Sequence, residues 1–331
     1  MDIRVVDPAD TGTLRRHWEI GRAADVASRP YDFYRSWESF RLASAFGRED
    51  YEVVLLGAFV DGVMWGAARV ELPLLDNLQT SHCLYYVHPA RQRQGIGRAL
   101  ARATFDLAAG RGRRVMVTET YAPIDEASTG LLFAEALGFT TALVDGMKVV
   151  DLPATEHLWE SLAEKAAPEH TDYRIHTWQD GLPEELVPGY CRLGELFLEQ
   201  APMGDLEVEA EKWDVDRVRN RERRNAATGR SDVSAGAVAP DGTLVGMTEV
   251  GIDVHAPHWG FQSGTIVAPE HRGHRLGLAV KLANHRQVRE RFPHCRVLVT
   301  GNADVNAPMN AINDALGYRE VERCIEMQRA L

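Results

Sequence analysis

Two segments of the chain, 180 positions apart, carry nearly the same pattern of residues. The first covers residues 87–100 and the second residues 267–280, and in each a Val and a Pro precede a glycine-containing loop. The same spacing relates Asp61-Gly62 to Asp241-Gly242. Agreement in two separate regions at a single spacing predicts that one fold is used twice in this chain.

The first of these segments has the local chemistry of an anion site. Residues 83–87 are β-branched or aromatic for the most part and predict a strand that Pro89 ends, and a helix is expected to begin near Ile96. The first turn of a helix has unpaired N–H donors and a partial positive charge. Gly95 and Gly97 have no Cβ, so phosphate oxygens can approach the backbone. A single turn of this kind is often only a tight turn, but its repetition favours a phosphate site.

Residues 92–97 resemble the signature of the GNAT acyltransferases, a family that uses acetyl-CoA. That signature is Gln or Arg, two residues, Gly, one residue, and then Gly or Ala, directly after a strand. Residues 92–97 fit it fully, and residues 272–277 fit it except that Arg275 stands where the first Gly belongs. The chain therefore resembles a tandem-GNAT protein, in an arrangement similar to that of mycothiol synthase. The resemblance implies two tandem GNAT acyl-CoA N-acyltransferase folds of the α/β class, each with a mixed sheet and helices on both faces.

The resemblance also implies a site for acetyl-CoA in each half. The loop amides would hold the pyrophosphate of CoA, and the strand before the loop would pair with the pantetheine arm. In the first half the implied residues are Tyr86, Val87, Gln92, Arg93, Gln94, Gly95, Ile96, Gly97 and Arg98. In the second half they are Ile266, Val267, Arg272, Gly273, His274, Arg275, Leu276 and Gly277.

Arg275 and Asn306 distinguish the second half from the first. Gly takes unusual backbone angles without steric cost, whereas Arg prefers ordinary ones. We expect ordinary angles at Arg275, so that the loop amides still face the phosphate and the guanidinium adds a donor. Asn306 precedes Ala307-Pro308 and suits the N-cap of a helix, and it is also a candidate for a cofactor contact.

Length and pattern predict two domains. A chain of 331 residues is long enough for about two cores. The expected N-terminal GNAT domain covers residues 1–152 and the C-terminal GNAT domain residues 172–331, with a linker at 153–171 that contains an amphipathic helical stretch. Asp-Gly pairs favour tight hairpin turns, so hairpins are predicted across Asp61-Gly62, Asp241-Gly242 and Asp145-Gly146.

Composition excludes several other classes of protein. The formal net charge of −11 argues against general binding of nucleic acid. Apolar runs stay shorter than the ~18 residues of a membrane span, so no membrane association is expected. The 4 cysteines are far apart, which is typical of reduced thiols in the cytoplasm, and no metal site is predicted from the spacing of His, Cys and carboxylates. The sequence does not indicate the oligomeric state.

The catalytic residues are harder to identify than the cofactor loops. Acetyl transfer to an amine requires a base that removes the amine proton. Glu119 and Glu249 lie on predicted strands and are candidates, although a solvated or ion-paired carboxylate is the commoner role. His82 is a weaker candidate. Many GNAT enzymes protonate the leaving thiolate with a Tyr, and Ala134 and Asn313 occupy the matching positions here, so that step would proceed without a phenol.

Three functions are compatible with these residues. The first is an acetyl-CoA-dependent N-acetyltransferase that transfers an acetyl group to a primary amine of a small molecule. The alternative is a CoA-binding module in which one or both copies are catalytically inactive, which the missing tyrosines favour. The third is a structural or interaction protein that binds no nucleotide. If the chain is an enzyme, its acidic balance favours cationic acceptors.

Overall fold

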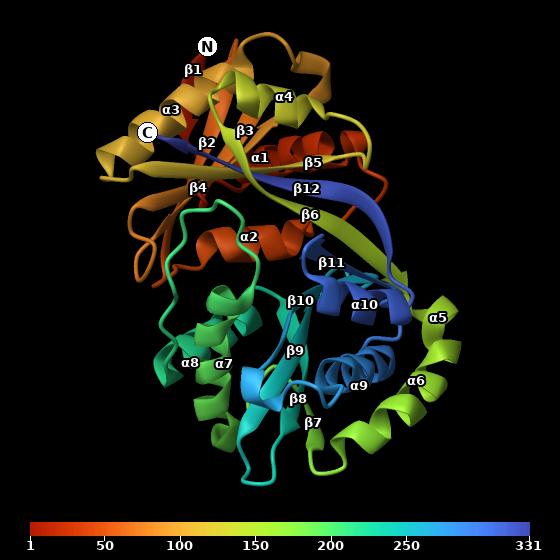
Figure 1. Cartoon of the computed structure of the whole chain (residues 1–331). Coiled ribbons are helices and arrows are strands. Elements are labelled where there is room, and N and C mark those ends of the chain that lie inside the picture. Colours follow the sequence, from red (N-terminus) through yellow and green to blue (C-terminus); the bar gives the residue numbers. More distant parts are fainter. The chain divides into compact units, whose positions relative to one another are not determined.

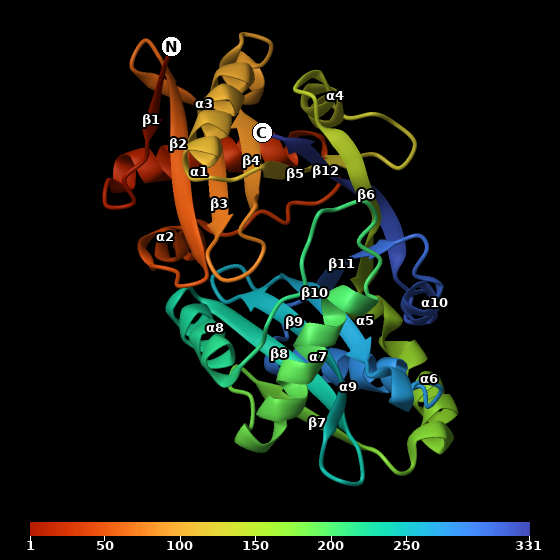
Figure 2. The ribbon, with the colours of Figure 1, turned by 60° about the vertical axis from the view of Figure 1, so that its left-hand side comes forward.

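The computed structural model describes residues 1–331 apart from the side chain of Ser28. The chain forms two compact units, and each contains segments that are far apart in the sequence. Unit 1 comprises Met1–Gly146, Met203–Glu209 and Val321–Leu331, and unit 2 comprises Met147–Pro202 and Ala210–Glu320. Each unit is a mixed sheet with helices on both faces, as the ribbons of Figures 1 and 2 show. The α/β fold class predicted from the sequence is therefore confirmed.

The sheet of unit 1 begins with five strands in chain order. These are β1 (Asp2–Val5), β2 (Tyr51–Val60), β3 (Val63–Pro73), β4 (Thr80–Val87) and β5 (Val115–Ala122). Neighbouring strands are antiparallel except β4 and β5, which are parallel. The sheet continues with β12 (Arg319–Ala330), antiparallel to β5, and then with the first part of β6 (Thr140–Asp151).

Successive side chains along the strands of unit 1 point to opposite faces of the sheet, and both faces are apolar. Leu56 and Ala68 pack in one cluster with residues of α3, whereas their neighbours Leu55 and Ala67 pack in another with residues of α1. The helices and short 3-10 segments of unit 1 are α1 (Thr11–Asp25), η1 (Val26–Ser28), α2 (Trp37–Ala45), η2 (Pro89–Arg91), α3 (Ile96–Gly110) and α4 (Thr129–Ala136). The predicted helix after the first glycine loop is α3, and it packs against β3 and β4.

Unit 2 repeats this arrangement. Its strands are the last part of β6, followed across the sheet by β11 (Val297–Ala303), β10 (Trp259–Val267), β9 (Leu244–Asp253), β8 (Arg230–Val238) and β7 (Arg174–Gln179). Its helices are α5 (Leu152–Thr155), α6 (Trp159–Ala166), α7 (Val187–Gln200), α8 (Val215–Ala227), α9 (Leu276–Arg291) and α10 (Ala307–Ala315), with 3-10 segments η3 (Glu156–Leu158), η4 (Ala167–His170), η5 (Glu184–Leu186) and η6 (Pro269–His271). Helix α9 follows the second loop as α3 follows the first.

The hairpin predicted across Asp145-Gly146 is wrong. The dipeptide lies inside β6, which is continuous from Thr140 to Asp151. A two-residue turn of this kind needs positive φ at its central residues. Asp61 and Gly62, which do form a turn, have φ of 51° and 79°, whereas neither Asp145 nor Gly146 is among the residues with positive φ. The chain is extended at this point, and the second part of β6 belongs to unit 2.

The two units therefore differ from the division expected from the sequence, in which consecutive domains at residues 1–152 and 172–331 are joined by a linker at 153–171. The helical stretch expected in the linker is α6, and its Trp159 packs in the core of unit 2 together with Leu152. At the other end of the chain, Ile325 and Met327 of β12 pack in the core of unit 1. Each unit thus completes its sheet with a strand that comes from outside the expected domain.

Candidate functional site

The parallel strands β4 and β5 of unit 1 separate partway along their length. Their pairing ends at His82 and Val117, although β4 continues to Val87 and β5 to Ala122. At the point of separation the Thr118 hydroxyl donates a hydrogen bond of 2.7 Å to the carbonyl of Cys83. Beyond this fork β4 pairs only with β3 and β5 only with β12, so the backbone groups that face each other can pair with a molecule placed between the strands.

A cavity of about 510 Å³ occupies the opening in unit 1. β4 and β5 line two of its sides, and the loop before α3 and the start of α4 line the others. Of the residues implied by the sequence for this copy, the cavity is lined by Tyr86, Val87, Gln92, Arg93, Gly95, Ile96, Gly97 and Arg98. Gln94 is exposed and is not among the lining residues. The structure thus brings nearly the whole predicted set to one cleft.

The loop before α3 has a left-handed conformation that favours glycine at the last residue before the helix. Gly95 is the N-cap of α3 with φ of 82°, and a Cβ added there meets no atom within 4 Å. Arg93, two residues earlier, also has positive φ, at 61°. A Cβ on Gly97 would lie 3.0 Å from the ring of Phe133 in α4. The unpaired N–H groups at the start of α3 therefore adjoin an open cavity, which is the geometry of an anion site.

The second loop has the same backbone pattern, which corrects the expectation for Arg275. Gly273 has φ of 89°, and Arg275 is left-handed with φ 53° and ψ 20°. Arg275 thus takes the conformation of Gly95 in the first loop, at a cost of about 1–2 kcal/mol for a residue with a Cβ. The conformation is tolerated because the Arg275 side chain is exposed and α9 begins directly after it.

Protein groups already engage several of the predicted donors around the second loop. Arg272 donates from Nη2 to Oε1 of Gln200 at 3.1 Å and from Nε to the carbonyl of Val267 at 3.2 Å. His274 Nδ1 lies 3.1 Å from the carbonyl oxygen of Glu169. Ile266 and Leu276 are buried in the core of unit 2. The second loop is therefore held by more intramolecular contacts than the sequence pattern indicated.

Asn306 has the structural role that its position predicts. It is the N-cap of α10, and its side chain accepts a hydrogen bond of 3.4 Å from the backbone N–H of Met309. Pro308 lies in the first turn of that helix. The capping prediction is confirmed, while the oxygen of the Asn306 amide is occupied by this bond.

Glu119 lies on β5 where two cavities meet. It lines the 510 Å³ cleft and also a neighbouring cavity of about 210 Å³. The hydroxyl of Tyr121 donates a hydrogen bond of 3.1 Å to its Oε1. Desolvation inside the cleft raises the pKa of Glu119 even though its side chain remains accessible to solvent, and the Tyr121 bond and the Arg29 charge oppose that shift. A carboxylate with a raised pKa beside an open cavity is suited to accept a proton.

Glu249 is in a different environment. Its Oε1 accepts a hydrogen bond of 2.5 Å from Arg221, and its Oε2 accepts one of 3.1 Å from the hydroxyl of Tyr190. Arg221 also pairs with Asp232 at 3.0 Å. The hollow beside this network measures only about 20 Å³. Glu249 is therefore an ion-paired structural carboxylate, the commoner of the two roles considered for it.

Sequence reasoning missed a charged group on the wall of the cleft in unit 1. Asp25 and Arg29 line it, and Arg29 pairs with Asp25 at 2.9 Å and with Glu322 at 2.7 Å. The guanidinium carbon of Arg29 lies 3.6 Å from the centre of the Tyr121 ring. No local signal identifies this group, because Glu322 is 293 positions away from Arg29.

Ala134 and Asn313, the two positions at which the sequence resemblance implies a Tyr, both have structural contacts. Ala134 is buried in the apolar core of unit 1. Asn313 accepts a hydrogen bond of 2.6 Å from Lys281 and donates one of 2.6 Å to Asn302. Burial lowers the pKa of Lys281 to about 7. Both positions are thus taken up by structural contacts.

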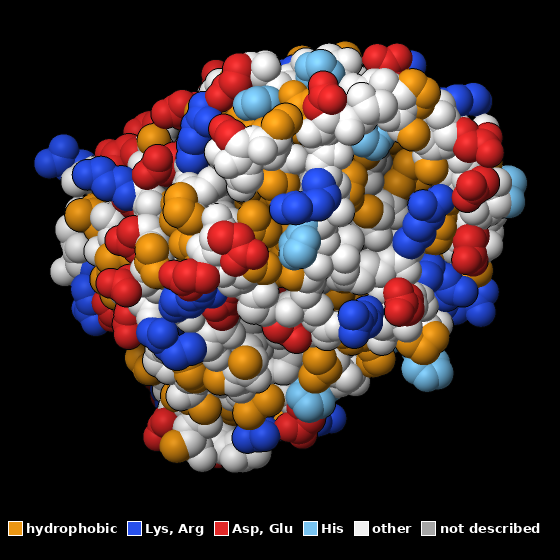
Figure 3. Space-filling model, turned by 90° about the horizontal axis from the view of Figure 1, so that it is seen from below, with side chains coloured by type: hydrophobic (Ala, Val, Ile, Leu, Met, Phe, Trp, Pro, Cys, Tyr) orange, Lys and Arg blue, Asp and Glu red, His pale blue; other side chains and the backbone are white. Residues whose placement is uncertain are grey.

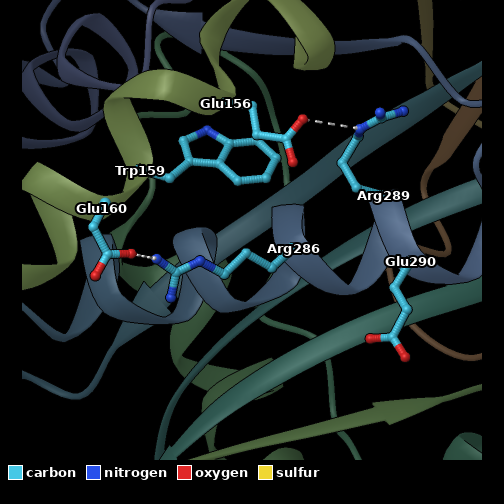
Figure 4. Close-up of a pocket in the computed structure, with 6 residues that line it drawn as sticks. All are labelled: Glu156, Trp159, Glu160, Arg286, Arg289 and Glu290. Atoms are coloured by element: carbon cyan, nitrogen blue, oxygen red, sulfur yellow. Dashed lines mark hydrogen bonds and ion pairs between the residues drawn. The ribbon is translucent and has the colours of Figure 1, made fainter.

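A hollow of about 440 Å³ on unit 2 lies between α6 and α9 and is lined by no residue of the second loop (Figure 4). The residues that line it are Glu156, Trp159, Glu160, Arg286, Arg289 and Glu290. Figure 4 shows its charges paired across the hollow, with Glu160 3.3 Å from Arg286 and Glu156 3.8 Å from Arg289. Because the two charges of each ion pair neutralise each other, the hollow is a weaker candidate for a ligand site than the cleft in unit 1.

On the face drawn in Figure 3, Lys and Arg side chains are interspersed with Asp and Glu, without a continuous basic patch among the described residues. Within the described part of the chain, every helix is too short or too polar to cross a bilayer.

Residues 17–139 match the family model described as Acetyltransferase (GNAT) family. Among solved structures, the chain is similar to a tandem GNAT protein from the clavulanic acid biosynthesis pathway, with 24% identity, a TM-score of 0.81, and coverage of 99% of this chain and 98% of that chain. It is also similar to a GCN5-related N-acetyltransferase from Sphaerobacter thermophilus, with 16% identity, a TM-score of 0.64, and coverage of 99% and 95%. A search of curated proteins found no match. These likenesses confirm the prediction of two GNAT folds in tandem.

Proposed function

We propose, from the premise that residues 17–139 form an acetyltransferase domain of the GNAT family, that this chain is an acetyl-CoA-dependent N-acetyltransferase. Unit 1 transfers the acetyl group to a primary amine of a small molecule. The observation that carries this proposal is the position of Glu119, which lines both the cleft below the first loop and the cavity beside it. One cavity suits the acyl donor and the other the acceptor, with a proton acceptor at their junction.

The residues of the cleft fit acetyl-CoA as cosubstrate. The N–H groups at the start of α3 and the exposed side chains of Gln92, Arg93 and Arg98 supply donors and positive charge for a pyrophosphate. At Tyr86 and Val87, β4 pairs with β3 on one side only, and its other side borders the same cavity and suits the amides of a pantetheine arm. A cavity of about 510 Å³ lies within the usual range for small-molecule sites.

The proposed transfer needs one proton acceptor on the protein. The neutral amine attacks the thioester carbonyl, the C–N bond forms, the C–S bond breaks, and CoA leaves as its thiolate. Glu119 takes the proton that the amine loses. Because Ala134 stands at the position of the usual phenol, the thiolate takes its proton from solvent, and the pKa of such a thiol is not far above neutral.

Two measurements test this function. Titration with acetyl-CoA followed by calorimetry is expected to give saturable heat, with the bound cosubstrate detected by native mass spectrometry. Release of free thiol is then measured with a panel of amines. Binding without thiol release from any amine would favour the CoA-binding module instead, and an absence of both signals would contradict the assignment.

Unit 2 is proposed to bind CoA without transferring an acetyl group. Its loop is left-handed at the same two positions as the first loop, which supports binding. Gly301 follows Thr300 on β11 where Glu119 follows Thr118 on β5, so the matching position has no carboxylate. Glu249 does not replace it, because Glu249 is ion-paired with Arg221. Binding of CoA without acetyl transfer is therefore the second candidate function, and it is proposed for unit 2 alone.

The second loop gives a prediction about Arg275. If its guanidinium contacts a CoA phosphate, Arg275→Ala should weaken binding at the second site several-fold in low salt and less in high salt, because salt screens the lost charge. Ala keeps the backbone constraint, so the change isolates the side chain. Binding is measured by calorimetry at two ionic strengths, with Arg286→Ala, an exposed position on the same helix, as the control. A stoichiometry of one that Arg275→Ala leaves unchanged would contradict binding at this loop.

A further inference from the structure

A second cavity in unit 1 adjoins the cleft proposed for the acyl donor. It measures about 210 Å³, and Leu84 and Glu119 line both spaces. Its polar lining consists of Arg69, Glu71, His82, Thr118, Glu119 and Glu326. An acceptor in this cavity would therefore meet the donor at Glu119, and the side chains around it would decide which amines are bound.

Glu326 is placed directly opposite Glu119. The two residues are partners in the antiparallel register of β12 and β5. Like charges at such positions destabilise a sheet. Glu71 in the same cavity is paired with Arg69 and lies 3.7 Å from Arg48, whereas Glu326 has no such partner among the described residues. The cavity thus contains two carboxylates, Glu119 and Glu326, that no ion pair among the described residues neutralises.

The surroundings of Glu326 also disfavour its negative charge. Burial, the charge of Glu119 and the charge of Asp145 together raise the pKa of Glu326 to about 7. A bound cation between the two strands would remove the repulsion. Within the described part of the chain no three His, Cys, Asp or Glu side chains are arranged to hold a metal ion, so an organic cation fits the cavity better.

The size of the cavity limits that cation. At about 30 Å³ for each water molecule, a volume of about 210 Å³ corresponds to roughly seven waters. This accommodates a short aliphatic arm with a charged end, and it is too small for a folded peptide segment. The walls at Cys83 and Leu84 are apolar and suit the methylene groups of such an arm.

We propose that the acceptor of this enzyme carries a second cationic group, as a short diamine or a basic amino acid does, and that Glu326 binds this second group while Glu119 accepts the proton of the reacting amine. The proposal rests on the acetyltransferase function proposed above. Glu326 then determines specificity for the acceptor without taking part in the chemical step. It is supplied by β12, far in sequence from the residues that bind the donor.

The test compares paired acceptors in wild type and Glu326→Gln. For a short diamine, Glu326→Gln is expected to raise KM about fivefold with little change in kcat, whereas KM for the monoamine of the same length changes less than twofold. The Kd for acetyl-CoA should be the same in both proteins. Glu126→Gln, in an exposed part of the loop before α4, removes the same charge away from the cavity and serves as the control.

A second measurement separates this proposal from the proposed function. Direct calorimetry with the diamine alone, in wild type and in Glu326→Gln, tests binding without catalysis. Diamine binding that is lost in the variant supports the cationic site even if no amine is acetylated. Equal KM changes for diamine and monoamine, or equal diamine affinities in the two proteins, would overturn the proposal while leaving acetyl transfer intact.

Discussion

Replacing Glu119 with Gln is expected to lower the rate of amine acetylation at least a hundredfold, while the Kd for acetyl-CoA changes less than twofold. The amide keeps the size of the side chain but cannot accept a proton, and general base catalysis typically contributes about 10²–10⁴-fold. Steady-state thiol release gives kcat and KM, and calorimetry gives the affinity for acetyl-CoA. Activity within a few-fold of wild type would mean that another group or water accepts the proton.

A companion variant tests the same residue through its pKa. Tyr121→Phe removes the hydroxyl that donates to Glu119, and this hydrogen bond lowers the pKa of the carboxyl. Without it the pKa of Glu119 rises further. Because the base must be ionised, activity increases with pH through that pKa, so the acid limb of the profile of kcat/KM should move to higher pH in Tyr121→Phe. A pH profile that is the same in Tyr121→Phe and wild type would mean that Glu119 is not the group that accepts the proton in the rate-determining step.

Gly95→Asp is expected to weaken acetyl-CoA binding at unit 1 at least tenfold, or about 1.4 kcal/mol. Gly95 has φ of 82°, and a Cβ added there meets no protein atom within 4 Å. The new carboxylate would instead occupy the space proposed for the pyrophosphate and repel it at the start of α3. Calorimetric titration of the folded variant, checked by circular dichroism, gives the change in affinity.

The turn between β2 and β3 provides a matched control for that variant. Gly62 has φ of 79° and also has no atom within 4 Å of an added Cβ, so Gly62→Asp introduces the same strain and the same charge away from the cleft. It should lower stability as Gly95→Asp does but leave the Kd for acetyl-CoA unchanged. Equal affinities in wild type and Gly95→Asp would place the pyrophosphate elsewhere.

The parts of the fold that the sequence predicted are those with local causes. Pro89 ends β4, and Gly95 begins α3, because each acts through its own backbone angles. The hairpin at Asp61-Gly62 has the same kind of local origin. These features place the cleft, which explains why most of the residues assigned to the first loop line it.

The parts that could not be predicted depend on partners far away in the sequence. Asp145-Gly146 has the composition of a turn, yet it is extended, since β6 is hydrogen-bonded to both β12 and β11. Glu326 entered no sequence argument because its relation to Glu119 exists only through the register of β12 and β5. Arg275 was mispredicted for a different reason. The steric preference of Arg favours ordinary backbone angles, but Arg275 is left-handed where the chain enters α9.

The placement of residues 321–330 in the sheet of unit 1 has a consequence for synthesis on the ribosome. Residues 1–146 of unit 1 are translated before unit 2, but the sheet of unit 1 lacks β12 until all of unit 2 has been made. Unit 2, which needs only residues 147–320, is the first that can fold to completion during translation. A ribosome that stops before residue 321 releases a chain with every residue of the first glycine loop and without a finished unit around it, so unit 1 is complete only in chains that include β12.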